Sequence, residues 1–465
     1  MVLSNNVTFG ANTAITLLGQ SINQTGGGVT QAAGTGSITM NTGAGAITAN
    51  GTNDFSTLNL TGATAQVNDV NALNLGASTL SGNLVVTGGA LTQTGALSVA
   101  GTSSFTAGAN PITLTQNNSF TGQVTLSNSG ANNVTVNNAI PLFLGNALTL
   151  GSGTLTLNAA AGITTGVSVT STGPQIYNGP VSLSNDTTIA GIGVTFANTV
   201  NGAKQLNVND SGATTFAGVV GGTVALTFLG TNAGGTSSSV GVNTTGVTQF
   251  GDNTTLSGTY SNAGFTTLGG TTTLAGTATT INAGAGNIAL TGFMDGTVAG
   301  GQSVILNSSG ITTLPTGIGG GNALLGITTD AGGTTRLNGT ITTTGTQTYN
   351  DAVTVLSNTT INGIGVTFAN TVNGTKSLVV NDSGATVFGA LVGGQREQRF
   401  QRPAKPYRWH HPNQRQKRPH ARHAEHQRPD RHFHRRIEPG PRHRGRCPHR
   451  QEQQQHRHAS GRVDR

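Results

Sequence analysis

A segment of about 51 residues occurs twice in this chain, and this duplication constrains the fold more than any other feature. Residues 172–222 and residues 344–394 align without a gap at an offset of 172 residues, and 34 of the 51 positions are identical. Self-similarity at a fixed spacing is typical of repeat proteins, in which each unit stacks on the next. The duplication therefore predicts a stacked array.

A shorter periodicity lies within the repeat. Apolar and polar residues alternate in triplets such as Val194-Thr195-Phe196, and turn-forming residues such as Asn201-Gly202 separate the triplets. Alternation with period two predicts strands with one inward face, and Gly, Asn and Asp favour tight corners. We therefore assign structural turn positions and no catalytic, cofactor-binding or metal-ligating residue. The turn positions are Gly202, Asp210, Gly212, Gly222, Gly374, Asp382, Gly384 and Gly394.

Two all-β architectures fit short strands at this spacing. A β-solenoid winds about 20 residues into each turn and stacks the turns at ~4.8 Å, whereas an array of β-sandwich domains is built from hairpins. Residues 1–394 contain no Trp, Cys or His, and their only cations are Lys204, Arg336 and Lys376. A sandwich core usually needs a large aromatic anchor, whereas a solenoid needs small corner residues and few charges that would repeat on neighbouring turns. This composition favours the solenoid, of roughly 20 turns, with the 172-residue offset covering eight or nine of them.

Composition divides the chain at Gln395. Residues 1–394 are uniformly rich in Gly, Thr, Asn and Ala and carry a net charge of −6, whereas residues 395–465 carry +14 and all eleven His. We interpret residues 395–465 as a disordered basic tail produced by a frameshift, because shifted Arg and Gln codons encode the residues that are common in residues 1–394. Two alternatives are a nucleic-acid-binding arm with Trp409 for stacking, and a metal-binding segment with His410-His411. No nucleic acid is expected as a partner on the preferred interpretation.

Residues 1–394, which we call the body, contain few side chains that could take part in catalysis. The body has nine Asp but no Glu, His or Cys, which excludes ordinary triads, thiolates and zinc sites. Lys204 lies six residues before Asp210, and Lys376 lies six residues before Asp382. A polysaccharide lyase on a β-helix would need such groups clustered on one face, but a pair in each repeat indicates scaffold. No cofactor is expected, and no apolar run is long enough for a spanning helix.

Residues 91–136 and residues 199–222 resemble the repeat regions of filamentous-haemagglutinin-like and autotransporter-type adhesins of Gram-negative bacteria. The resemblance covers nearly all of residues 1–394. It implies a right-handed parallel β-helix exported to the cell surface or the medium, with host or environmental glycans or proteins as partners. The N-terminus has no charged region followed by an apolar region, so no signal peptide is expected in this chain. It is expected to be part of a larger polypeptide.

The sequence therefore predicts a stalk or passenger segment of a large bacterial adhesin, without catalysis. The first alternative is a surface-layer or biofilm-matrix protein without a receptor. The second is a β-helix protein that binds or cleaves polysaccharide. A distinct adhesive tip would separate the first two functions, and no stretch of this sequence resembles one.

Overall fold

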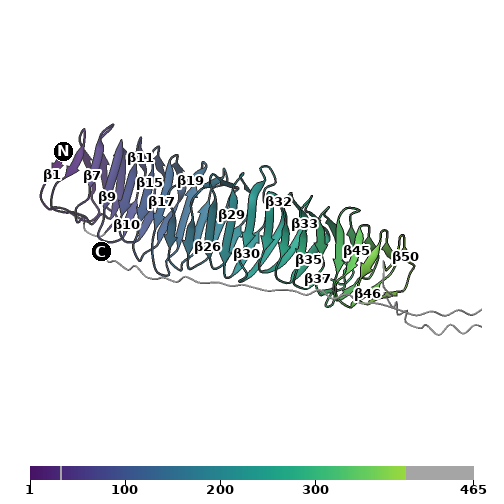
Figure 1. Cartoon of the computed structure of the whole chain (residues 1–465). Coiled ribbons are helices and arrows are strands. Elements are labelled where there is room, and N and C mark those ends of the chain that lie inside the picture. Colours follow the sequence, from purple (N-terminus) through teal and green to yellow (C-terminus); the bar gives the residue numbers. More distant parts are fainter. Residues whose placement is uncertain (32–33, 394–465) are drawn as a thin grey trace, which may run out of the picture. The chain divides into compact units, whose positions relative to one another are not determined.

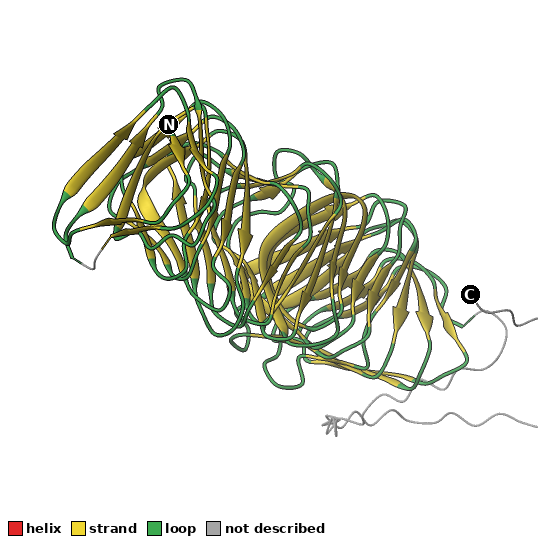
Figure 2. Ribbon diagram, turned by 90° about the vertical axis from the view of Figure 1, so that its left-hand side faces the viewer, coloured by secondary structure: helices red, strands yellow, loops and turns green. Residues whose placement is uncertain are grey.

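A computed structural model describes residues 1–31 and 34–393. Within these residues every regular element is a β-strand and no helix is present, as Figure 2 shows. The strands pair in parallel from one turn to the next and form a β-solenoid of about 19 turns, so the predicted fold class is confirmed. The predictions for residues 395–465 and for Gly394 lie outside the described residues.

The strands are short. Those that begin before residue 181 are β1 (Val2–Leu3), β2 (Val7–Phe9), β3 (Ala14–Leu18), β4 (Ile22–Gln24), β5 (Val29–Gln31), β6 (Ser37–Asn41), β7 (Ala46–Ala49), β8 (Thr57–Gly62), β9 (Thr64–Asn68), β10 (Leu73–Leu75), β11 (Ser78–Leu80), β12 (Leu84–Thr87), β13 (Leu91–Gln93), β14 (Leu97–Val99), β15 (Ser103–Thr106), β16 (Ile112–Phe120), β17 (Gln123–Ser127), β18 (Val134–Asn138), β19 (Leu142–Leu144), β20 (Leu148–Leu150), β21 (Leu155–Asn158), β22 (Ile163–Thr165), β23 (Val169–Ser171) and β24 (Gln175–Asn178). Those that follow are β25 (Val181–Leu183), β26 (Thr187–Gly191), β27 (Val194–Phe196), β28 (Val200–Asn201), β29 (Gln205–Asp210), β30 (Ala213–Phe216), β31 (Leu226–Thr231), β32 (Thr236–Phe250), β33 (Asn253–Asn262), β34 (Thr266–Leu268), β35 (Thr272–Asn282), β36 (Ile288–Leu290), β37 (Met294–Gly296), β38 (Ser303–Asn307), β39 (Ile311–Thr313), β40 (Gly317–Ile318), β41 (Gly326–Thr329), β42 (Thr334–Leu337), β43 (Thr340–Thr342), β44 (Gln347–Tyr349), β45 (Ala352–Val355), β46 (Thr359–Gly363), β47 (Val366–Phe368), β48 (Val372–Gly374), β49 (Leu378–Asp382) and β50 (Thr386–Phe388).

The strands stack side by side along the coil, as Figure 1 shows. In its second half the pairings form three parallel sheets, and the chain visits them in turn. Sheet 1 contains β22, β25 and β28, passes through the bridged residue Val220, and continues through β32, β33, β35 and β38 to β50. Sheet 2 runs from β21 through β24 and β27 to β49. Sheet 3 runs from β20 through β23 and β26 to β48. The longest strands, β32, β33 and β35, bend around a corner and contribute to more than one sheet.

The core lies inside the coil because alternate residues of each strand point inward. In β14, for example, Leu97 and Val99 are fully buried while the intervening Ser98 is exposed. Aromatic side chains stack directly on one another across turns. Tyr177, Phe196 and Phe216 form one stack with ring centroids 5.1 and 5.3 Å apart. The equivalent residues in the second repeat form another, with centroids 5.2 and 5.1 Å apart.

The two copies of the repeat lie on different sheets. Tyr177 lies on β24 in sheet 2, whereas its equivalent Tyr349 lies on β44 in sheet 1. Twenty-five strand positions separate the two residues along the chain, which at three positions per turn makes 8⅓ turns. The second copy is therefore rotated by one third of a turn about the solenoid axis and displaced by about 40 Å along it, since each turn rises ~4.8 Å.

The duplication preserves the interior more than the surface. Seventeen positions differ between the copies, and only two of these, Gly179 and Leu183, are buried in the first copy. Every buried position from Thr187 to Gly221 is identical in the second copy. The three sheets therefore accept the same inward sequence, because each offers the same parallel register and the same apolar neighbours.

Candidate functional site

The two aspartates predicted at turns each cap a corner of the preceding turn. Asp210 is 1% exposed, and its carboxylate accepts hydrogen bonds from the N–H groups of Gly193 (2.7 Å), Val194 (2.9 Å) and Gly212 (2.8 Å). The Thr214 hydroxyl donates a fourth bond at 3.0 Å. The carboxylate thus holds two successive turns together at one corner, and no cation is needed.

Asp382 repeats this arrangement in the second copy, where the four donors are equivalent residues at 2.7 to 3.0 Å. Partial burial acts to raise the pKa of Asp382, but the N–H groups of Gly365 and Gly384 and the other donors outweigh it, and the net pKa is lowered. Within the described residues, neither Lys204 nor Lys376 forms a salt bridge with Asp210 or Asp382.

Four of the predicted turn glycines lie where a side chain would be disfavoured, for two different reasons. Gly202 and Gly374 have positive φ angles of 131° and 144°, a conformation that side chains disfavour. Gly212 and Gly384 have no positive φ, but a Cβ on either would lie 2.7 or 2.8 Å from the backbone nitrogen of the glycine one turn earlier. Gly222 is exposed after β30, and Gly394 lies outside the described residues.

Three other aspartates, Asp69, Asp252 and Asp351, are buried without a cationic partner among the described residues, and the last two share one arrangement. Asp252 accepts hydrogen bonds from the hydroxyls of Thr231 and Ser237, and Asp351 accepts them from Thr329 and Thr335. Burial raises the pKa of both carboxyls, and the hydroxyl donors only partly offset this effect. Their partners are strand hydroxyls inside the coil, so these carboxyls join adjacent turns and do not face a cleft.

Asp69 makes the stability of its turn depend on pH. Burial raises its pKa from 3.8 to about 6, against hydrogen bonds from the N–H groups of Phe55 and Asn71. A raised folded-state pKa stabilises the fold below pH 4, and this contribution is lost as the pH rises through 6. We expect this turn to lose about 1–2 kcal/mol between pH 4 and pH 7, after allowance for solvent screening.

Hydrogen exchange of the Phe55 and Asn71 amides at several pH values, corrected for intrinsic rates, measures this loss. The variant Asp69→Asn should flatten the dependence. A wild-type protection factor that is constant from pH 4 to pH 7 would contradict the assignment.

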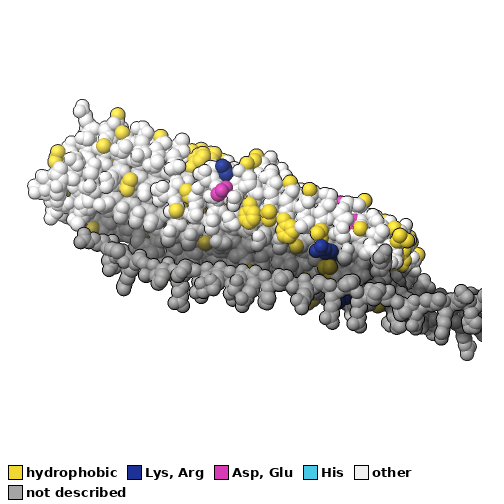
Figure 3. All heavy atoms as spheres, viewed as in Figure 1, with side chains coloured by type: hydrophobic (Ala, Val, Ile, Leu, Met, Phe, Trp, Pro, Cys, Tyr) yellow, Lys and Arg dark blue, Asp and Glu magenta, His cyan; other side chains and the backbone are white. Residues whose placement is uncertain are grey.

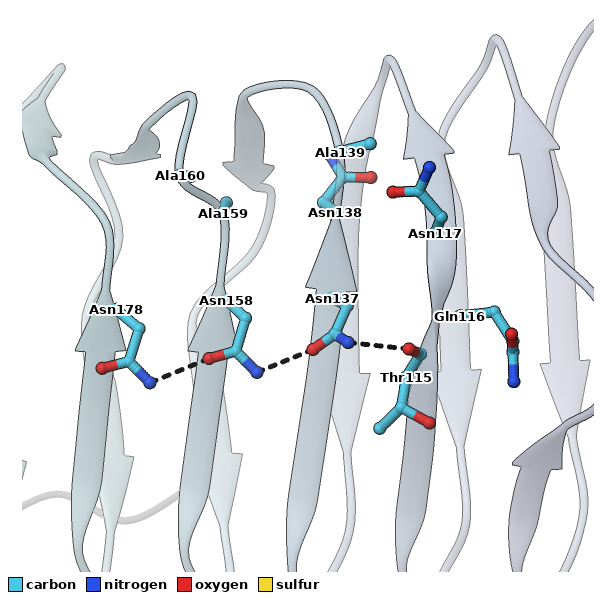
Figure 4. A pocket seen from close by; sticks show the side chains of 10 residues that line it. All are labelled: Thr115, Gln116, Asn117, Asn137, Asn138, Ala139, Asn158, Ala159, Ala160 and Asn178. Atoms are coloured by element: carbon cyan, nitrogen blue, oxygen red, sulfur yellow. Dashed lines mark hydrogen bonds between the residues drawn. The ribbon is translucent and has the colours of Figure 1, made fainter.

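A polar hollow lies on the outside of β16, β18, β21 and β24, where β16 and β18 continue sheet 2 toward the N-terminus, and we call it the amide hollow. It has a volume of about 400 Å³. Its floor is an asparagine ladder that crosses three turns, shown in Figure 4. Asn178 donates to the Oδ1 of Asn158 at 2.8 Å, Asn158 donates to the Oδ1 of Asn137 at 2.6 Å, and Asn137 donates to the carbonyl of Thr115 at 2.7 Å.

The hollow exists because the turns differ in length. Between the paired residues Leu114 and Asn118, β16 has two more residues than β18 has over the same stretch. This bulge carries Gln116 and Asn117, which line the end of the hollow beside Asn137. The loops after β18 and β21 supply Ala139, Ala159 and Ala160 above the ladder.

The amide hollow offers donors and acceptors but no charge. Its lining residues are Thr115, Gln116, Asn117, Asn137, Asn138, Ala139, Asn158, Ala159, Ala160 and Asn178. A carboxamide has two N–H groups, and each ladder asparagine uses only one of them within the described residues. We did not predict this site from the sequence. The signal was present, because Asn137, Asn158 and Asn178 recur at about one turn of 20 residues.

The described residues contain no group of three or more His, Cys, Asp or Glu that would hold a metal ion. They also contain no helix with the length and apolar character needed to cross a membrane. Most of the face in Figure 3 is polar and uncharged, with scattered hydrophobic side chains.

Comparison with known proteins identifies one repeat family. Residues 62–127, which run from the last residue of β8 to the end of β17, match a family model described as repeats of unknown function (DUF5649). The chain gives no significant match to a curated protein or to a solved structure. The match covers a small part of the chain, and the solenoid fold is consistent with a structural repeat protein.

Proposed function

We propose that residues 1–393 form a rigid stalk segment of a large bacterial adhesin, exported to the cell surface or the medium, and that the segment performs no catalysis. The observation that carries this proposal is the 8⅓-turn duplication, which keeps the interior and lets the surface change. A protein selected for one binding face would need repeats that return to that face. A stalk needs only length and continuous stacking.

The polar surface supports an extracellular location in the proposal. Charged side chains are few on the described residues, and the cations among them are Lys204, Arg336, Lys376 and the N-terminal amine. Asn, Thr and Ser side chains cover the sheets and form ladders across the turns. Such a rod needs no disulfide or metal for its stability, because each turn covers its neighbour.

Surface labelling tests the location. An antibody raised against recombinant residues 1–393 should label intact cells that produce the full protein, or capture the protein from their medium. Lysed cells serve as the control for total protein. Labelling that appears only after lysis would refute the proposal. A surface-layer or matrix protein would share this result, so ligand binding must separate the two functions.

A further inference from the structure

We propose that the amide hollow binds a neutral polysaccharide chain that lies along sheet 2. This inference rests on the proposed surface location, because only an exported protein meets such polymers. Asn137, Asn158 and Asn178 line the hollow in a row, one turn apart, and each keeps a second amide N–H that has no partner within the described residues. Sugar hydroxyls both donate and accept hydrogen bonds, and carboxamides offer both functions.

The absence of charged side chains in the hollow indicates which class of polymer it can bind. None of its ten lining residues is ionisable, so an anionic or sulfated chain would find no cation to offset its desolvation. The hollow also has no free strand edge, because β16, β18, β21 and β24 pair with one another and β24 pairs onward with β27. Peptide ligands usually need such an edge, an apolar groove or a charged cluster. A neutral glycan fits this chemistry best.

The ladder also gives the site a direction. Each amide donates toward the N-terminal end of the coil, from Asn178 to Asn158 to Asn137 to the Thr115 carbonyl. The Oδ1 atom of Asn178 accepts no hydrogen bond from the described residues and is left as a terminal acceptor. Beside the ladder, Thr113, Thr135 and Thr156 pair across the same turns and extend the polar track. Turns spaced at ~4.8 Å thus present a repeating polar pattern to a linear polymer.

A second ladder provides a matched control. In the second repeat, Asn381 donates to Asn362, and Asn362 donates to Thr342. The residue equivalent to Asn362 in the first repeat is Ala190, which shows that the solenoid accepts alanine at this position. The variant Asn362→Ala therefore breaks a ladder of the same kind away from the amide hollow.

The test is a saturation-transfer NMR titration of recombinant residues 1–393 with oligosaccharides of four to eight sugars. The panel contains cello-, xylo-, manno- and laminari-oligosaccharides, with heparin fragments as the sulfated probe. We expect at least one neutral series to bind with a Kd on the order of 1 mM, because the site is open and makes few contacts. Binding should not depend on salt, because no charge lines the site.

Two variants locate the binding. Asn158→Ala should weaken it at least fivefold, and Ala160→Trp, which places a bulky ring in the hollow and leaves the ladder asparagines in the sequence, should abolish it. Asn362→Ala should leave the Kd unchanged, and circular dichroism confirms that each variant is folded. The proposal is overturned if no neutral probe binds, if heparin binds more tightly, or if Asn362→Ala weakens binding as much as Asn158→Ala. None of these results would affect the surface-labelling test, so the proposed stalk function does not depend on whether the hollow binds a polysaccharide.

Discussion

A chain that lacks residues 187–358 should fold into a solenoid that is shorter by 8⅓ turns, or about 40 Å at ~4.8 Å per turn. This deletion removes 172 residues and joins Asp186 to Thr359. Every buried side chain after the junction is the one that occupied that position before, because the buried positions from Thr187 to Gly221 are identical in the two copies. The last turns should therefore dock on the same neighbours as the first copy did.

Small-angle scattering or negative-stain electron microscopy gives the length. The matched control removes residues 187–348, which is ten residues less and joins Asp186 to Tyr349. It places Asp351 at the inward position of Ile189, where a buried carboxylate would lack hydroxyl partners. The control should lose its folded C-terminal turns. If the 172-residue deletion unfolds to the same extent, the equivalence of the three sheets is wrong.

The variant Asp210→Ala should destabilise the turns around β26 to β30 by about 3–5 kcal/mol, because it leaves three backbone N–H groups without an acceptor. Those groups belong to Gly193, Val194 and Gly212, and the Thr214 hydroxyl loses its acceptor as well. The effect should stay local, since stability in a solenoid is a sum of neighbour interactions. Native-state hydrogen exchange of these three amides measures it directly.

Asp382→Ala is the internal comparison. It removes the same four hydrogen bonds, but Asp382 is half-buried, so water can replace part of what is lost. We expect an effect of about 1–2 kcal/mol at this position. Asp210→Asn retains one acceptor oxygen and should fall between the two alanine variants. Unchanged exchange at Gly193 and Val194 in Asp210→Ala would show that the carboxylate does not hold the corner.

The strands can be predicted from the sequence because their pattern is local. A triplet such as Leu97-Ser98-Val99 alternates inward and outward whatever lies next to it, and Gly or Asn at the corners ends each strand. The predicted number of roughly 20 turns is close to the 19 observed, because turns that range from 17 residues (Thr236 to Asn253) to 25 residues (Ala278 to Ser303) average near 20. Asp210 and Asp382 are the last residues of β29 and β49, and each lies beside a Ser-Gly pair of the kind that favours a turn.

The amide hollow cannot be predicted in this way, because it depends on a difference in length between neighbouring turns. The two extra residues of β16 leave Gln116 and Asn117 standing out beside a shorter neighbour. The spacing of about 20 residues between Asn137 and Asn158 is compatible with adjacent turns, but this spacing alone does not fix their register, because the turns differ in length. That information belongs to strand pairing, which involves residues about 20 positions apart.

By itself, the sequence determined that this protein is an all-β stack with an apolar interior, a polar surface and a duplicated block. Only the tertiary structure decided on which of the three sheets the equivalent residues of each copy lie. A two-residue alternation is the same on every sheet, so the pattern places no strand on a particular side of the coil. The lengths of the corners decide that, and over 172 residues they sum to 8⅓ turns, which carries Tyr349 to a different sheet from Tyr177.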